Sequence, residues 1–215
     1  MPERLPVAVL ISGRGSNMRA LLEAAARPDF PARIVLVLSN VAGAAGLAVA
    51  SAAGVRTATV PHKGLKGDRE AHERQVDAAL REAGAELVCL AGYMRLLTPF
   101  LVTAWAGRMI NVHPSLLPAF PGLDTHRRAL AAGAKLHGCT VHRVTEAMDD
   151  GPILGQAAVP VLPGDTEERL AARVLAAEHR LYPAVLAAVA RGEPPAMPEA
   201  GAMLLNPLPL PGLAD

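Results

Sequence analysis

The sequence PVAVLISGRGSN, residues 6–17, decides the fold, and an Ala-, Leu- and Met-rich segment follows it at residues 18–26. The apolar run at residues 6–11 is typical of a buried strand, the glycines after it indicate a tight loop, and the apolar spacing over residues 18–26 favours a helix. A strand, a loop and a helix in this order predict the first unit of an α/β sheet.

The same alternation continues along the chain. Asp68 is a suitable N-cap for one of the later helices. Further strands are predicted at residues 34–38, 55–60, 86–91 and 109–113, and further helices at residues 42–53 and 68–83. Because strands alternate with helices, we expect a Rossmann-like α/β fold, with a mostly parallel sheet, right-handed crossovers and helices on both faces.

The pattern changes after residue 136. Strands predicted at residues 139–144 and 153–161 have no helix between them, so they are expected to form an antiparallel pair at the sheet edge, near the C-terminal part of the domain. A long helix is predicted at residues 166–190, and Pro183 is expected to kink or split it.

Composition bounds the class of protein. The 215 residues are 51% hydrophobic and carry a net charge of +1, which suits a globular domain and offers no basic field for nucleic acid. We expect a single domain over residues 1–192 and a Pro- and Gly-rich surface tail over residues 193–215. Cys89 and Cys139 lie in apolar runs and indicate no disulfide framework, so a cytoplasmic location is expected. The sequence shows neither a signal-peptide pattern nor an apolar run near the roughly 20 residues of a membrane span.

A second informative stretch is INVHPSLLP, residues 110–118. Asn111 and His113 are two residues apart on a predicted strand, so both side chains project from one face at its carboxyl end, where open α/β sheets bind ligands. The amide can donate a hydrogen bond to a developing oxyanion, and the imidazole can carry a proton near neutral pH. Asp149, in the turn-like sequence MDDGP, is the best candidate for a carboxylate that sets the protonation of His113.

The glycine loop at residues 12–17 leaves two interpretations open. It lacks the third glycine of a dinucleotide fingerprint, since that position is Met18, and the second strand ends in Ser39 rather than an acidic residue. The loop is therefore either a backbone nest that binds a single phosphate with Ser16 and Asn17 at a helix N-terminus, or a tight turn whose glycines only satisfy backbone angles.

Other reactive side chains fit no complete motif. His137 and His142 lack the paired spacing of a zinc site, and His142 is predicted to be a strand residue that finds a hydrogen bond. Neither cysteine lies in a nucleophile motif, and the sequence has no Gly-x-Ser-x-Gly elbow. An acyl group would therefore pass directly between substrates, without a covalent enzyme intermediate and without a metal.

Five motifs together make the chain similar to a known family. They are LISGxGSN at residues 10–17, LAGYMR at 90–95, NxHPSLLP at 111–118, PGL at 121–123 and DxGP at 149–152. From about residue 7 to residue 193 the chain resembles the phosphoribosylglycinamide formyltransferases, folate-dependent transferases of de novo purine (IMP) biosynthesis. The resemblance implies transfer of a formyl group from 10-formyltetrahydrofolate, a co-substrate, to the amine of 5-phosphoribosylglycinamide.

The resemblance also implies roles for individual residues. The catalytic residues would be Asn111, His113 and Asp149. The ribonucleotide would be bound by Gly15, Ser16, Asn17 and Glu178, and the folate by Arg69, Met94, Arg95, Leu96, Leu97 and Asn111. The implied partners are these two small molecules, with neither nucleic acid nor membrane, in a monomer or a homodimer.

Three positions depart from the family pattern, and three alternatives remain open. Arg14, Asp124 and Asp150 stand where relatives often carry a small polar residue, histidine and glycine, respectively. A tRNA formyltransferase is expected to carry a further C-terminal RNA-binding domain, and a formyltetrahydrofolate hydrolase an N-terminal regulatory domain. A noncatalytic phosphosugar-binding protein is the third alternative.

Overall fold

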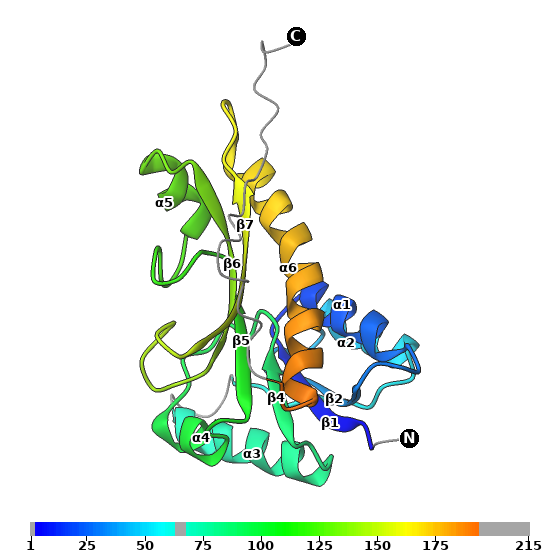
Figure 1. The fold of residues 1–215 in the computed structure, drawn as a ribbon. Coiled ribbons are helices and arrows are strands. Elements are labelled where there is room, and N and C mark those ends of the chain that lie inside the picture. The colour runs from blue at the N-terminus through cyan, green and yellow to red at the C-terminus, as the bar shows by residue number, and fades with distance from the viewer. Residues whose placement is uncertain (1–2, 63–67, 194–215) are drawn as a thin grey trace.

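The computed structural model describes residues 3–62 and 68–193. Apart from Glu193, the predicted tail lies outside the described residues. Within them, helices lie on both sides of a sheet that is seen nearly edge-on in Figure 1. None of the described helices is long and apolar enough to cross a membrane.

Among the described residues, the seven strands form one sheet in the order β3-β2-β1-β4-β5-β6-β7. The strands are β1 Leu5–Ile11, β2 Ala32–Ser39, β3 Thr57–Thr59, β4 Leu87–Leu90, β5 Met109–His113, β6 Leu136–Arg143 and β7 Ile153–Pro160. Strands β1 to β5 pair in parallel, whereas β6 pairs antiparallel with both β5 and β7. The predicted fold class, including the antiparallel pair at the edge, is confirmed.

The helices cover both faces of the sheet. They are α1 Ser16–Ala25, α2 Ala45–Ala52, α3 Arg69–Glu82, α4 Pro99–Ala104, α5 Thr125–Ala131 and α6 Glu167–Ala190. Helices α1, α2 and α6 lie on one face, and α3 and α4 on the other (Figure 1). Asp68 is the N-cap of α3 as predicted, since its side chain accepts a hydrogen bond of 2.9 Å from the Ala71 N–H.

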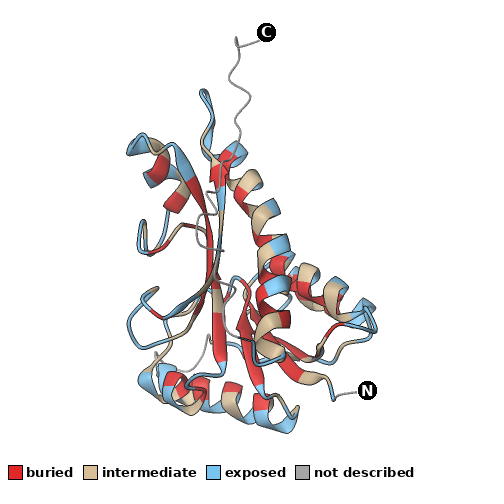
Figure 2. Cartoon of the chain, viewed as in Figure 1, coloured by how far each residue is buried: buried red, intermediate tan, exposed pale blue. Residues whose placement is uncertain are grey.

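The central strand β1 divides its side chains between two hydrophobic cores. Val7, Val9 and Ile11 pack with residues of α1 and α6, whereas Ala8 and Leu10 pack with residues of α3 and α4. This alternation follows from the two-residue period of a strand. Figure 2 shows the buried residues concentrated along the sheet and on the helix faces that meet it.

Strand order brings two loops together. The chain proceeds from β1 outward to β2 and β3, and then returns to β4 on the other side of β1. The segments that follow β1 and β4 therefore leave the same edge of the sheet beside each other, at the topological switch point where open α/β sheets bind ligands. Asn111 and His113 lie on the next strand, β5.

Helix α6 corrects one prediction. It continues from Glu167 to Ala190 through Pro183, so the expectation that this proline splits the helix is wrong. Proline removes one N–H donor, but the turns around it stay attached to the core through buried Tyr182, Val185 and Leu186. Packing outweighs the lost backbone bond, as is usual for a helix with a long apolar face.

Candidate active site

Strand β5 places an amide and an imidazole on one face, as predicted. Asn111 and His113 are both within Met109–His113, and the His113 side chain is buried. The Nδ1 atom of His113 lies 3.4 Å from Oδ2 of Asp149, although the two residues are far apart in sequence. The structure therefore brings Asn111, His113 and Asp149 into one cluster.

The backbone around Asp149 fixes its carboxylate. Asp149 has a φ of 56°, in the left-handed region, and its Oδ2 accepts a hydrogen bond of 2.8 Å from the Gly122 N–H. A Cβ atom at Gly151 would lie 1.8 Å from the carbonyl oxygen of Arg143, so only glycine lets this loop fold back against β6. These contacts orient the carboxylate toward His113.

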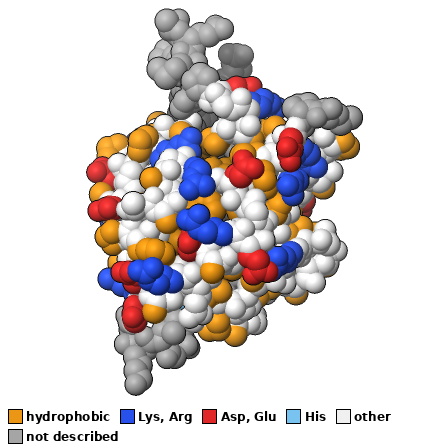
Figure 3. All heavy atoms as spheres, turned by 90° about the horizontal axis from the view of Figure 1, so that it is seen from below, with side chains coloured by type: hydrophobic (Ala, Val, Ile, Leu, Met, Phe, Trp, Pro, Cys, Tyr) orange, Lys and Arg blue, Asp and Glu red, His pale blue; other side chains and the backbone are white. Residues whose placement is uncertain are grey.

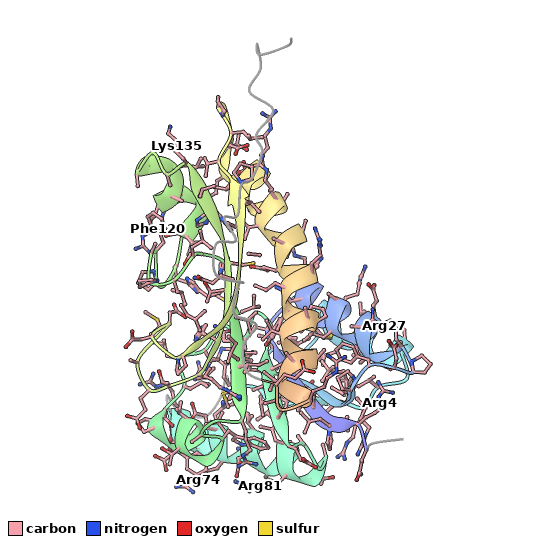
Figure 4. All side chains as sticks on the ribbon, in the orientation of Figure 1. Arg4, Arg27, Arg74, Arg81, Phe120 and Lys135 are labelled. Atoms are coloured by element: carbon pink, nitrogen blue, oxygen red, sulfur yellow. The ribbon has the colours of Figure 1, made fainter. Side chains whose placement is uncertain are left out.

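Both ring nitrogens of His113 face oxygen atoms. Nδ1 faces the Asp149 carboxylate, and Nε2 lies 3.1 Å from the carbonyl oxygen of Phe120. Figure 4 labels Phe120 in the loop region near α5. Carbonyl and carboxylate oxygens only accept hydrogen bonds, so a proton on either ring nitrogen faces an acceptor. These two contacts fix the position of the ring between Phe120 and Asp149.

His142 is a member of the cluster that sequence reasoning missed. It was predicted to be a strand residue with a hydrogen bond, but its position across from Asn111 in the β5–β6 register was not anticipated. Its Nε2 lies 3.3 Å from Nδ2 of Asn111 and 3.8 Å from Oδ1 of Asp149. Burial lowers the pKa of His142 below its usual range, so the ring is neutral at pH 7.

The glycine loop ends at the N-terminus of α1. Gly15 is the N-cap with a φ of 70°, and no side chain caps the first turn. A Cβ atom at Gly15 would lie 3.0 Å from Cε of Met18 and 3.3 Å from Cα of Gly46, so a side chain there would crowd the start of α2 as well as strain the backbone. Uncapped N–H groups and an exposed Ser16 make this turn chemically suited to an anion.

Asn17 and Glu178 form a buried contact beside that loop. Nδ2 of Asn17 donates a hydrogen bond of 2.6 Å to Oε2 of Glu178, which joins α1 to α6. Burial raises the pKa of Glu178, and the hydrogen bond from Asn17 opposes that shift. The Oδ1 atom of Asn17 is buried and has no hydrogen-bond partner within the described residues.

The segment after β4 lies against the glycine loop. The Met94 N–H donates 2.8 Å to Oγ of Ser12, and the Ser12 N–H donates 3.1 Å to the carbonyl of Gly92. Met94 and Leu96 are 65% and 61% exposed and lie two residues apart, so this segment presents apolar surface to solvent. Arg95 and Leu97 are half-buried. The uncapped start of α1 and this exposed apolar segment follow strands β1 and β4, so strand order places them at the same sheet edge as the end of β5.

With this geometry in place, comparison with known proteins decides the family. The model of the formyl transferase family matches residues 5–186. The chain belongs to the formyl transferase family.

Several relatives are similar over most of this formyl transferase chain. The phosphoribosylglycinamide formyltransferase of Escherichia coli is 44% identical over 86% of the chain and 87% of its own length. The trifunctional purine biosynthetic protein adenosine-3 of Bos taurus is 48% identical over 89% of the chain. The chain spans only 19% of that bovine protein's length, and similarly small shares of the other trifunctional relatives.

Solved structures agree with this assignment. The phosphoribosylglycinamide formyltransferase from Brucella melitensis is 58% identical, with a TM-score of 0.84 over 87% of this chain and 96% of that one. The glycinamide ribonucleotide transformylase 1 from Symbiobacterium toebii is 46% identical, with a TM-score of 0.86 over 89% of this chain and 90% of that one.

Other predicted positions of the formyl transferase are less connected. Arg69 is exposed at the first residue of α3, and within the described residues no hydrogen bond or ion pair joins it to the other predicted site residues. Asp124, with a φ of 57°, is the N-cap of α5 and pairs with Arg127 on the surface. Arg14 and Asp150 are exposed. In the described part of the chain, His, Cys, Asp and Glu side chains form no group of three or more that suits a metal ion.

Proposed function

We propose that this chain transfers a formyl group from 10-formyltetrahydrofolate to the amine of 5-phosphoribosylglycinamide, giving formylglycinamide ribonucleotide and tetrahydrofolate. The observation that carries this proposal is the cluster of Asn111, His113 and Asp149, which strand order places at the same sheet edge as an uncapped helix N-terminus and an exposed apolar segment. Acyl transfer from a folate to a phosphate-bearing amine needs a group that stabilises the oxyanion, a site for the phosphate and a surface for the folate rings next to one another.

The two substrates bind on opposite sides of this cluster. The phosphate of the ribonucleotide accepts hydrogen bonds from the first turn of α1, at Gly15, Ser16 and Asn17. Glu178, already bonded to Asn17, faces the ribonucleotide from α6. The folate lies along residues 94–97, where Met94 and Leu96 offer apolar surface and Arg95 a positive charge. Arg69 contacts the folate from the start of α3.

The chemistry follows from the charges in the cluster. The amine nitrogen attacks the formyl carbon, and the carbonyl oxygen becomes the oxyanion of a tetrahedral intermediate. The Asn111 amide donates to that oxygen, and the charged His113 ring stabilises it. Asp149, 3.4 Å from His113, stabilises the imidazolium by opposite charge. When the intermediate collapses, the bond to the folate nitrogen breaks, and that nitrogen takes up the proton lost by the amine, through His113 or a water molecule.

The proposed function also has consequences for the domain organisation, location and partners of the chain. We infer a single catalytic domain over residues 1–192, a cytoplasmic location, and small molecules as the partners in catalysis, with neither nucleic acid nor membrane. Figure 3 shows basic and acidic side chains mixed over the face seen from below, which fits the net charge of +1. Monomer and homodimer are both compatible with this proposal.

One assay separates the proposed reaction from its alternatives. The purified chain is incubated with 10-formyltetrahydrofolate, with and without 5-phosphoribosylglycinamide, and release of tetrahydrofolate is followed by absorbance. We expect release only with the ribonucleotide. Release with water alone would indicate a hydrolase, and release that requires methionyl-tRNA would indicate a tRNA formyltransferase. Ribonucleotide binding without turnover would indicate a noncatalytic binding protein.

A further inference from the structure

We propose that His142 is a positioning residue that fixes which way the side-chain amide of Asn111 points, so that an N–H rather than the amide oxygen faces the reacting carbonyl. This inference deepens the proposed function and rests on it, because the amide's direction matters only if Asn111 stabilises an oxyanion.

The geometry starts at a backbone carbonyl. Nδ1 of His142 lies 2.9 Å from the carbonyl oxygen of Arg143, which only accepts hydrogen bonds, so Nδ1 carries a proton. In the neutral ring, Nε2 is then an unprotonated acceptor. The terminal atom of Asn111 that lies 3.3 Å from Nε2 must therefore be the NH₂ group. The Arg143 carbonyl thus dictates the orientation of the Asn111 amide through His142.

The strand register supports this chain of contacts. Asn111 and His142 are opposite each other in the antiparallel β5–β6 pair, which places both side chains on one face. The NH₂ group uses one hydrogen for His142, and its second hydrogen is available to the substrate. Asp149 lies 3.8 Å from His142 and 3.4 Å from His113, so it links the two histidines. The NH₂ group that contacts His142 therefore belongs to the same cluster as His113.

The charged groups that face His142 come from two elements. Asp149, in the loop between β6 and β7, favours a proton on the ring, and His113 on β5 opposes one. The Arg143 guanidinium, on β6 itself, donates to the carbonyl of Gly107 instead. Burial, the largest influence, keeps His142 neutral at pH 7.

Protonation of His142 reverses the arrangement. A proton on Nε2 needs an acceptor, and the amide of Asn111 supplies one only by turning its oxygen toward the ring. The protonated ring also competes with His113 for Asp149. We therefore expect protonation of His142 to lower activity. Because burial lowers the pKa of His142 from 6.5, the activity should fall only at pH values below the usual range for histidine.

The direct test is ¹⁵N NMR of the ligand-free full chain. We expect the His142 ring in the Nδ1-protonated tautomer at neutral pH, and we expect the Asn111 side-chain amide resonance to shift with the same midpoint as the His142 ring on acidification. A ring protonated on Nε2 at neutral pH, or an Asn111 amide that does not respond to His142, overturns the proposal. This readout requires no turnover, so it stays distinct from failure of the proposed formyl transfer.

A kinetic test compares two substitutions of His142 that are expected to have different effects on kcat. His142→Phe removes the acceptor, and we expect kcat to fall about 10- to 100-fold with little change in either KM, less than the loss of a whole oxyanion donor. His142→Gln keeps an acceptor oxygen that cannot be protonated, so it restores much of kcat and weakens the acid loss. His72→Gln is the matched control, because His72 is equally buried and bonds the Val60 carbonyl outside the site. Full activity of His142→Phe, or no rescue by a folded His142→Gln, contradicts the proposal.

Discussion

At the scale of single residues, charge and backbone geometry decide the chemistry. Asp149 lies in a left-handed conformation, receives the Gly122 N–H, and faces His113 at 3.4 Å. The adjacent Asp150 is exposed. Water screens an exposed charge strongly, whereas a carboxylate in direct contact with a buried ring is screened little. The two neighbouring aspartates therefore have very different influence on His113.

This contrast yields a prediction for Asp149→Asn. The substitution keeps the shape of the side chain and removes the negative charge that faces His113, so we expect kcat to fall by about 100-fold or more. Steady-state kinetics at a fixed pH, for the variant and the wild-type chain, measure the loss. Asp150→Asn is the control and is expected to be mild. If Asp150→Asn is the more damaging change, the carboxylate is assigned wrongly.

At the scale of elements, two features matter for the site: the position at which α1 begins and the contacts that attach α6 to the sheet. Helix α1 begins at Ser16 after the N-cap Gly15, whose φ of 70° and close approach to Met18 and Gly46 favour glycine there. Helix α6 reaches the sheet through Tyr182, whose hydroxyl lies 3.0 Å from the carbonyl of Leu90 on β4 and 3.2 Å from that of Ile110 on β5. Helix α1 thus leaves an uncapped first turn at the edge of the sheet, and α6 joins the two strands β4 and β5.

A prediction at the start of α1 is Gly15→Val. A side chain there enters the space of Met18 and Gly46 and adds backbone strain of about 1–3 kcal/mol, so the loop moves and KM for the ribonucleotide rises at least about tenfold. The affinity for a folate analogue, measured by titration, changes little. Gly13→Ala is the matched control, since a Cβ there meets nothing within 4 Å. Equal losses for both ligands contradict the assignment.

A prediction on α6 concerns stability. Tyr182→Phe removes the buried hydroxyl that donates to the carbonyls of Leu90 and Ile110, so the free energy of unfolding should fall by about 1–3 kcal/mol. Urea unfolding followed by circular dichroism measures the change. An unchanged midpoint would mean that these contacts contribute nothing to holding α6 on the sheet.

At the scale of the whole molecule, the sequence predicts what depends on local pattern. The period of apolar residues predicted all seven strands and the long helices, and the five motifs indicated the site cluster. Helices α4 and α5 were not predicted, because six or seven residues carry too little periodicity. The contact of His142 with Asn111 was missed because it depends on pairing between strands 31 residues apart. The predicted split at Pro183 is wrong because tertiary packing holds the turns on both sides of it.

Acid stability of the whole chain is a further prediction. His137 lies between Phe120 and His126, and burial lowers its pKa to about 4. His137 takes up a proton near pH 6.5 in the unfolded chain and only near pH 4 in the folded chain. The neutral ring therefore contributes stability that is complete above pH 6.5 and is lost as the pH falls to 4. Urea unfolding at several pH values measures the loss. His137→Phe should show a weaker pH dependence, and an equal slope would rule out this histidine as the cause.

If this cluster transfers a formyl group directly between two bound substrates, Asn111→Ala must slow the transfer step itself. The measurement is single-turnover transfer of a ¹³C-labelled formyl group from 10-formyltetrahydrofolate to 5-phosphoribosylglycinamide by the wild-type chain and the variant. We predict that the wild-type chain places the label on the ribonucleotide amine, and that the variant binds both substrates normally but transfers the label about 100- to 1,000-fold more slowly. Label recovered as formate whether or not the ribonucleotide is present, or a variant with the wild-type rate, would contradict the account.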